Sequence, residues 1–171
     1  IVVGARLVAS GAACALVSAG NTGAAMAASL FHIGRISGVE RPAIAIPLPT
    51  RTGLCLVLDA GANAEVRPEH LLQFARMGRI YAQEVYGIRE PRVGLLNVGE
   101  EPTKGTRVVQ EAHGLLSAAE GLGFVGNVEG KDVPHGVADV VVCDGFVGNI
   151  VLKLAEGVSS ALFDILRRNV F

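Results

Sequence analysis

Residues 140–157, VVVCDGFVGNIVLKLAEG, decide the fold class. The run VVVC has no polar residue and predicts a strand that is buried on both faces, as in parallel sheets covered by helices. Asp144 follows this strand directly. Gly145 and Gly148 then permit a tight turn, and Asn149 supplies a carboxamide. Apolar residues recur at helical spacing beyond that point. The stretch therefore predicts a strand, a polar turn and a long helix, with a ligand site above the turn.

Four further apolar runs end in loops rich in glycine and asparagine. They lead into SAGNTG (18–23), DAGAN (59–63), NVGEEPTKG (97–105) and GNVEG (126–130). The carboxyl ends of parallel strands lie along one edge of a sheet, where ligands bind. Ordinary turn chemistry explains any one loop, but five together predict a shared polar cleft. The candidate binding residues in these loops are Gly20, Asn21, Asp59, Asn63, Asn97, Asp144, Gly145 and Gly148.

The composition predicts one α/β domain in the cytoplasm. The chain has 171 residues, of which half are hydrophobic, with 22 glycines and no tryptophan, which is typical of a buried sheet with close-packed turns. The formal net charge of −1 argues against binding to nucleic acid, which needs a basic face. No uncharged apolar run approaches the roughly 18 residues of a membrane span. The three cysteines lie in or beside apolar runs and favour buried thiols in a reducing compartment.

Strands that alternate with helices predict a Rossmann-like three-layer α/β sandwich with a mostly parallel sheet. Strands are expected at 43–46, 54–58, 92–96, 123–125 and 138–143. Helices are expected from about residue 24 to 31, 68 to 86 and 106 to 120, and a last helix is expected from the end of the 145–149 turn to Phe171. The short connection at 50–53 predicts an antiparallel hairpin within the sheet.

Familiar cofactor and nucleophile motifs are missing from the sequence. It contains no Walker A loop, no complete dinucleotide fingerprint and no Gly-x-Ser-x-Gly elbow. Its four histidines show no metal-binding spacing. We therefore expect neither a metal nor a cofactor.

Lys104 stands out because it lies at a predicted helix start. The helix dipole disfavours a cation there by about 0.3–1 kcal/mol. A salt bridge with Glu100 or Glu101 would offset this cost, and so would a phosphate that rests on both the ammonium and the helix N-terminus. Both interpretations stay open on the sequence alone.

Six motifs together resemble the PlsX family of phosphate acyltransferases of bacterial phospholipid synthesis. In chain order they are SAGNTGA, LDAGAN, PEHLLQFARMGRIYA, VGLLNVGEEPTKG, FVGNVEG and DVVVCDGFVGNIVLKLAEG. Members of that family are considerably longer. Residues 1–171 are therefore expected to be a fragment, one α/β domain without the family's N-terminal strand region and C-terminal segment.

The resemblance implies transfer of a long-chain acyl group from acyl carrier protein to inorganic phosphate. The acyl phosphate would pass to a glycerol-3-phosphate acyltransferase in the membrane. The family's fold is similar to those of phosphotransacetylases and isopropylmalate dehydrogenases, and its members are cytoplasmic homodimers that work at the inner membrane surface. The resemblance assigns catalytic or phosphate-binding roles to Lys104 and Asn149, and pocket-lining roles to Asn21, Asn97 and Asp144.

The residues permit direct attack of phosphate on a thioester. Phosphate already carries negative charge and a thiol of pKa about 8.5 leaves readily, so positioning and charge neutralisation matter more than a strong base. Lys104 would fix the phosphate, and Asn149 or loop N–H groups would hold the developing oxyanion. Cys143 is not expected to act as a nucleophile, because the neighbouring carboxylate of Asp144 raises a thiol pKa and no histidine is close in sequence.

Two other functions remain open. The first is a phosphate acetyl- or butyryltransferase that uses a coenzyme A thioester, and the second is a non-enzymatic binding module on the same fold. A carrier-dependent enzyme would present basic residues to the acidic carrier protein. Arg35, Arg41, Arg51, Arg76 and Arg79 are candidates, although a solvated surface explains them equally well.

Overall fold

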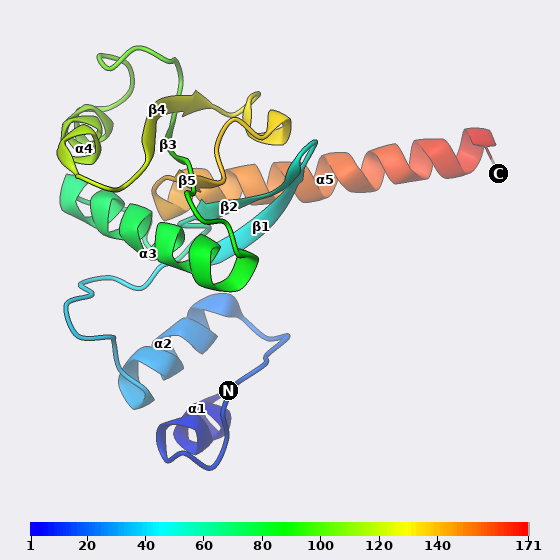
Figure 1. Ribbon diagram of the computed structural model, residues 1–171. Coiled ribbons are helices and arrows are strands. Elements are labelled where there is room, and N and C mark those ends of the chain that lie inside the picture. The colour runs from blue at the N-terminus through cyan, green and yellow to red at the C-terminus, as the bar shows by residue number, and fades with distance from the viewer. Residues whose placement is uncertain (171) are drawn as a thin grey trace. The chain divides into compact units, whose positions relative to one another are not determined.

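The computed structural model describes residues 1–170, which form two compact units, Ile1–Pro42 and Ala43–Phe171 (Figure 1). The first unit contains two helices in contact with each other, α1 (Val2–Ala9) and α2 (Thr22–His32). The second unit contains the sheet and the remaining helices. Each unit is described by itself.

The connection between α1 and α2 is irregular, and the apolar run before the 18–23 loop does not form a strand. Val17 is 95% exposed, and a run of three residues without a partner strand cannot satisfy its backbone groups. Asn21 instead caps α2, since its Oδ1 accepts a hydrogen bond from the N–H of Ala24 at 2.9 Å. Gly20 donates its N–H to Ser18 Oγ at 3.2 Å.

The second unit is built on a five-stranded sheet of order β1-β2-β5-β3-β4. The strands are β1 (Ala45–Thr50), β2 (Gly53–Leu58), β3 (Val93–Asn97), β4 (Phe124–Glu129) and β5 (Val140–Val142). Strands β1 and β2 are antiparallel and the other neighbours are parallel. This confirms the predicted α/β class, the mostly parallel sheet and the hairpin. Strand β1 contains two prolines, which an edge strand tolerates because its outer N–H groups need no partner.

Three α-helices and one short 3₁₀ helix complete this unit: α3 (Pro68–Tyr86), α4 (Arg107–Ala118), η1 (Val133–His135) and α5 (Gly145–Val170). The positions of α3 and α4 agree with the predicted ranges, whereas α5 begins at Gly145 and includes the residues expected to form a turn. Alternate residues of the central strands divide the core, so that Leu58 and Val142 pack with Phe74 of α3 while Val57 and Val141 belong to a separate cluster on the other face.

Two details of α3 follow from its approach to the sheet. Gly78 lets the helix come close to β5, because a Cβ there would lie 2.6 Å from Val140 Cγ1. The apolar face of α3 is buried at Leu71 and Phe74, whereas Val85 in the last turn is 56% exposed.

Strand β4 is longer than the predicted 123–125 and includes most of the GNVEG segment expected to be a loop. Phe124 pairs with Val93, whereas Gly126 pairs with the next residue, Gly94, so that Val125 forms a bulge. Gly126 has φ +103°, a conformation that favours glycine. The bulge lets the strand continue to Glu129 and buries Asn127 within it.

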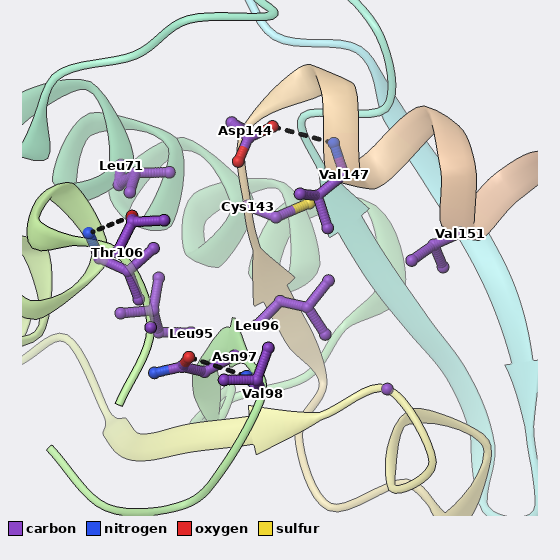
Figure 2. A pocket seen from close by; sticks show the side chains of 13 residues that line it. Leu71, Leu95, Leu96, Asn97, Val98, Thr106, Cys143, Asp144, Val147 and Val151 are labelled. Atoms are coloured by element: carbon purple, nitrogen blue, oxygen red, sulfur yellow. Dashed lines mark hydrogen bonds between the residues drawn. The ribbon is translucent and has the colours of Figure 1, made fainter. Parts of the chain in front are cut away.

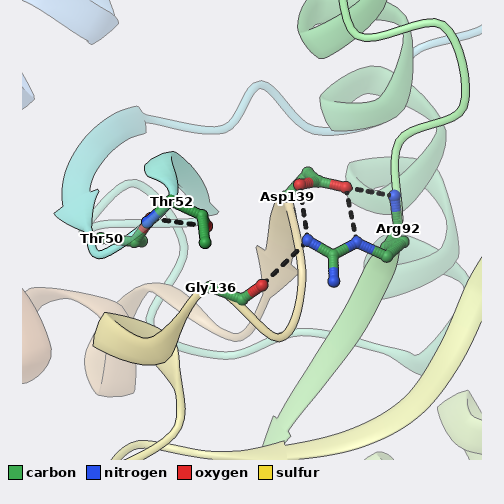
Figure 3. Close-up of polar contacts among 5 residues, drawn as sticks. All are labelled: Thr50, Thr52, Arg92, Gly136 and Asp139. Carbon is green, nitrogen blue, oxygen red and sulfur yellow. Dashed lines mark hydrogen bonds and ion pairs between the residues drawn. The ribbon is translucent and has the colours of Figure 1, made fainter.

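An ion pair joins the amino ends of β3 and β5, opposite their polar ends (Figure 3). The Arg92 guanidinium donates from Nε and Nη2 to the two carboxylate oxygens of Asp139, at 3.0 and 2.9 Å, and Nη2 also donates to the carbonyl of Gly136 at 2.9 Å. Burial opposes ionisation of Asp139, but the hydrogen bonds and the charge of Arg92 outweigh it and lower the pKa of this carboxyl. The pair fixes the two strands whose other ends form the site.

Helix α5 extends away from the sheet and is mostly exposed (Figure 1). By length and composition it could cross a membrane, since residues Gly145–Asn169 contain an apolar window of mean hydropathy 1.4 of which 6% is buried. The charged residues Lys153 and Glu156 interrupt its apolar sequence and pair with each other at 2.8 Å. The apolar side chains of α5, among them Leu154 and Leu162, have no covering layer within residues 1–170.

Candidate functional site

A pocket of about 300 Å³ lies at the carboxyl ends of β3 and β5 (Figure 2). This volume is at the lower end of the range for small-molecule sites. Its apolar wall comes from three helices and one strand: Leu71, Leu95, Leu96, Val109, Val147 and Val151. Its polar residues are Asn97, Thr106 and Asp144. The arrangement places polar groups from two strand ends and one helix start beside a largely hydrocarbon surface.

Asp144 lines this pocket and caps α5. Its Oδ1 accepts a hydrogen bond from the N–H of Val147 at 2.9 Å, which satisfies a free donor of the first helical turn. A carboxylate at a helix N-terminus also interacts favourably with the helix dipole. An anion above this turn would therefore meet a negative charge that already occupies the position.

Asp59 organises the 59–63 loop that lies against the start of α5. Its carboxylate is fully buried, and Oδ1 accepts from the N–H groups of Ile44, Gly61 and Ala62 at 2.9–3.1 Å. Oδ2 accepts from the backbone N–H and the Nδ2 of Asn63, at 2.6 and 2.8 Å. Since both oxygens are engaged with the protein, Asp59 holds the loop rigid, and contact with a substrate would require these bonds to break.

Gly145 and Gly148 permit the close approach of α5 to this loop. Gly145 donates its N–H to the carbonyl of Asn63 at 2.7 Å, and a Cβ at position 145 would lie 2.8 Å from Asp59 Oδ2. A Cβ at position 148 would overlap the backbone oxygen of Asp59. The glycines at these two predicted positions are thus explained by packing.

Asn149 belongs to the same group. Its side chain lies over Gly61, where a Cβ would be 3.6 Å from Asn149 Oδ1. Its amide makes no hydrogen bond within residues 1–170 and its side chain is exposed. Because Val147 and Val151 line the pocket, Asn149, two residues from each, projects from another side of the helix. The structure therefore places Asn149 beside the 59–63 loop and not in the pocket wall.

Lys104 lies in the loop before α4. Its backbone oxygen accepts from Asn97 Nδ2 at 3.1 Å and its N–H donates to the carbonyl of Glu101 at 3.0 Å. In the part of the chain that the structure describes, its ammonium makes no salt bridge with Glu100 or Glu101, so the local ion pair considered above is not formed. The ammonium stands free two residues before the N-cap of α4, Thr106.

Cys143 is buried at the end of β5, with its Sγ 3.5 Å from the backbone oxygen of Asp59. Burial, followed by the charges of Asp144 and Asp59, raises the pKa of the thiol far above its usual value. The group is therefore a protonated packing residue, as expected, since a nucleophilic cysteine needs a lowered pKa.

Glu100, in the loop that carries Lys104, belongs to a cluster of three acidic groups with Glu129 and Asp132. Their carboxylate oxygens lie within 4.8 Å of one another. Lys131 Nζ lies 3.0 Å from Glu129 Oε2. The hydrogen bond and the charge of Glu129, with smaller contributions from Asp132 and Glu100, raise the pKa of Lys131. The Lys131 ammonium thus offsets part of the negative charge of this cluster.

The match of the family model for "fatty acid synthesis protein" covers residues 1–170. The chain belongs to that family. Two relatives in it are named phosphate acyltransferase, one from Heliobacterium modesticaldum, 61% identical over 167 residues, and one from Elusimicrobium minutum, 57% identical over 170 residues. The matches cover 98% and 99% of this chain and 50% of each relative. The chain thus spans about half the length of these relatives, and the predicted resemblance to phosphate acyltransferases is confirmed.

A solved structure shares the fold of this family member. The EutD phosphotransacetylase from Staphylococcus aureus aligns with a TM-score of 0.67 at 22% identity, over 93% of this chain and 55% of that one. The likeness confirms the expected similarity to phosphotransacetylase folds.

Sequence reasoning on this family member found the polar loops but missed the pocket wall. Val109, Val147 and Val151 line the pocket, although none of them was expected to belong to the site. The available signal was the excess of apolar residues beyond one face of the last helix. Gly20 and Asn21 belong to the first unit. Their predicted roles in a substrate site stay predictions.

Proposed function

We propose that the whole protein transfers a long-chain acyl group from acyl carrier protein to inorganic phosphate. The observation that carries this proposal is the free ammonium of Lys104, whose next two residues, Gly105 and Thr106, line an apolar pocket of about 300 Å³. The names of the relatives support transfer to phosphate. The proposal goes beyond those names when it takes acyl carrier protein as the donor of the acyl group.

Phosphate would bind at the loop before α4. Lys104 supplies a positive charge without a partner in the described residues. Thr106 caps α4 by accepting from the N–H of Val109, and the N–H groups of Arg107 and Val108 in the same turn would supply donors. The α5 N-terminus is less suitable, because Asp144 caps it with a negative charge. The proposed phosphate position is therefore the one expected for Lys104 from the sequence, and it differs from the turn after β5, where a ligand site was also expected.

The acyl chain would lie in the pocket. Its wall carries aliphatic side chains from α3, β3, α4 and α5. A bound acyl chain would remove this apolar surface from water, which stabilises the complex by about 25 cal/mol for each Å² buried. An acetyl group would leave most of such a wall uncovered. The apolar lining therefore favours a long acyl chain over the alternative acetyl-coenzyme A substrate.

The reaction would be a direct displacement. A phosphate oxygen attacks the thioester carbonyl carbon, the C–S bond breaks, and the carrier thiolate leaves and takes a proton from water. Lys104 neutralises and orients the phosphate, and the free carboxamide of Asn149 or loop N–H groups hold the developing oxyanion. No acyl-enzyme on Cys143 forms, since the raised pKa of its thiol disfavours the thiolate.

The partners and location follow from the same proposal. The product would be an acylating agent for a glycerol-3-phosphate acyltransferase of the membrane, and the enzyme would work as a cytoplasmic homodimer at the inner membrane surface. The exposed apolar residues of α5 support a helix-to-helix contact between two copies. The exposed arginines, such as Arg76, would face the acidic carrier protein.

The decisive experiment incubates the full-length protein with inorganic phosphate and either palmitoyl carrier protein or acetyl-coenzyme A. Acyl phosphate is trapped with hydroxylamine, and free thiol is counted in parallel. Phosphate-dependent thiol release from the palmitoyl donor alone supports the proposal. Equal or faster release from acetyl-coenzyme A would favour the small-acyl enzyme, and no release from either donor would favour a binding module.

A further inference from the structure

Three carboxamide side chains hold the loop that carries Lys104. Asn97 Nδ2 donates to the carbonyl of Lys104 at 3.1 Å. Gln110 Nε2 donates to the carbonyls of Thr103 and Gly105, at 2.8 and 3.1 Å. Asn127 Nδ2 donates to the carbonyl of Glu101 at 2.8 Å and to that of Glu100 at 3.4 Å. Amides from β3, α4 and β4 thus fix successive carbonyl groups of one loop.

Asn127 acts on Lys104 through a single shared acceptor. The carbonyl oxygen of Glu101 accepts the Nδ2–H of Asn127 and also the backbone N–H of Lys104, which lies 3.0 Å away. The contact crosses from β4 to the loop after β3, because Asn127 pairs in register with Leu95. The position of the Lys104 backbone therefore depends on a side chain 23 residues further along the chain.

Stability alone does not account for an amide at this position. Asn127 is 9% exposed and its Oδ1 is buried without a hydrogen-bond partner in the described residues. A buried acceptor without a partner is unfavourable for folding, and an apolar residue of similar shape would avoid that cost. Only the Nδ2 group of the amide forms hydrogen bonds, and both go to the loop that carries Lys104.

We propose that Asn127 is a positioning residue that sets the affinity for phosphate by holding the Glu101 carbonyl and, through it, Lys104. It touches no substrate. The inference rests on the proposed function, in which phosphate is the acceptor. A displacement of Lys104 by about 1 Å weakens phosphate binding ten- to hundredfold and leaves the acyl pocket unchanged.

The test compares Asn127→Leu with the wild type in the full-length protein. Leucine keeps the approximate shape, removes the donor and removes the buried acceptor. We expect the phosphate KM to rise about ten- to hundredfold, with an unchanged KM for the acyl donor and an unchanged or higher Tm. Asn127→Ala should raise the phosphate KM in the same way and also lower the Tm.

Gln83→Ala is the matched control, because Gln83 Nε2 likewise donates to a loop carbonyl, that of Arg89, at 3.0 Å. This variant should leave the phosphate KM unchanged. An unchanged phosphate KM in Asn127→Leu would overturn the inference. So would a loss of activity that appears only as a lower kcat, in proportion to the loss of folded protein.

A second readout does not depend on turnover. Reductive methylation of Lys104, followed by mass spectrometry, measures whether inorganic phosphate protects the ammonium. We expect protection in the wild type and its loss in Asn127→Leu. If the wild type transfers no acyl group but shows this difference, the proposed function fails and the inference stands. If transfer occurs but phosphate does not protect Lys104, the inference fails and the function stands.

Discussion

Gly148 of α5 lies directly against the backbone carbonyl oxygen of Asp59, and a Cβ at position 148 would overlap that oxygen. At this contact the start of α5 packs closely against the 59–63 loop, which the Asp59 carboxylate stabilises. The contact joins the two halves of the polar edge, which come from positions about 90 residues apart in the chain.

The first prediction is that Gly148→Ala destabilises the protein by about 1–3 kcal/mol, because the added methyl group forces α5 away from the loop. Gly157→Ala in the same helix is the control, since its Cβ would meet no atom within 4 Å, and it should be stabilised by about 0.5–1 kcal/mol. Urea unfolding of both variants measures the difference. Equal stabilities would mean that the helix start can shift without cost.

The second prediction is that Lys104→Ala lowers acyl transfer to phosphate by about 10²–10³-fold and leaves the Tm unchanged, because the ammonium has no ion-pair partner in residues 1–170. Lys153→Ala removes an exposed lysine that pairs with Glu156 and should keep full activity. Steady-state kinetics and thermal unfolding are the measurements. Near-normal turnover of Lys104→Ala would remove Lys104 from the site.

The third prediction concerns the pocket. Val151→Phe fills part of the wall, so turnover of palmitoyl donors should fall about tenfold or more while octanoyl donors are affected less. Val85→Phe is the control, because Val85 is 56% exposed and does not line the pocket. Competition between donors of different chain length measures the shift. A uniform loss for all chain lengths would place the acyl chain elsewhere.

The fourth prediction is a pH dependence of stability. The folded pKa of Asp139 is lowered, so between that value and the unfolded value of about 3.9 the unfolded state binds more protons. The free energy of unfolding therefore falls as pH drops through this window, and the contribution of Asp139 is complete above it. Asp139→Asn should lose about 1–3 kcal/mol at neutral pH and show a smaller change below pH 4. Parallel pH profiles for the wild type and the variant would contradict this.

The fifth prediction is that the full-length protein is a dimer held through α5. Leu154 and Leu162, about two turns apart on this helix, are 65% and 55% exposed. Leu154→Glu together with Leu162→Glu should give monomers in sedimentation, because two charges would be buried at the contact. Glu156→Gln, on the same helix, is the control. A monomeric wild type at micromolar concentration would exclude the contact.

Local pattern was sufficient to predict most of the fold. The apolar VVVC run, the acid after it and the helical spacing beyond predicted β5, the position of Asp144 and the body of α5, because each is determined by residues close in sequence. The start of α5 was expected too late, since residues 145–149 are helical and not a turn. The exposed position of Lys104 at a helix start was also predictable. Strand β4 was not, since its continuation past Gly126 depends on pairing with β3.

The candidate site was predicted less completely because it is made by distant residues. The sequence predicts that Asp59 binds a substrate. In the folded chain, however, N–H groups of Ile44 and of the 59–63 loop donate to both oxygens of its carboxylate. Asn127 reads as a turn residue, yet it is buried beneath another loop. Such roles depend on which donors and acceptors meet in the folded chain, and spacing along the sequence does not contain that information.

The bulge at Val125 has a consequence for solubility. Strand β4 is an outer strand of the sheet, so its outward N–H and C=O groups could add a strand from another molecule. The register shift and the glycine at 126 bend this strand near its start and shorten the straight run of such groups. The irregularity that obscured the strand in the sequence thus also protects the protein from aggregation through its sheet edge.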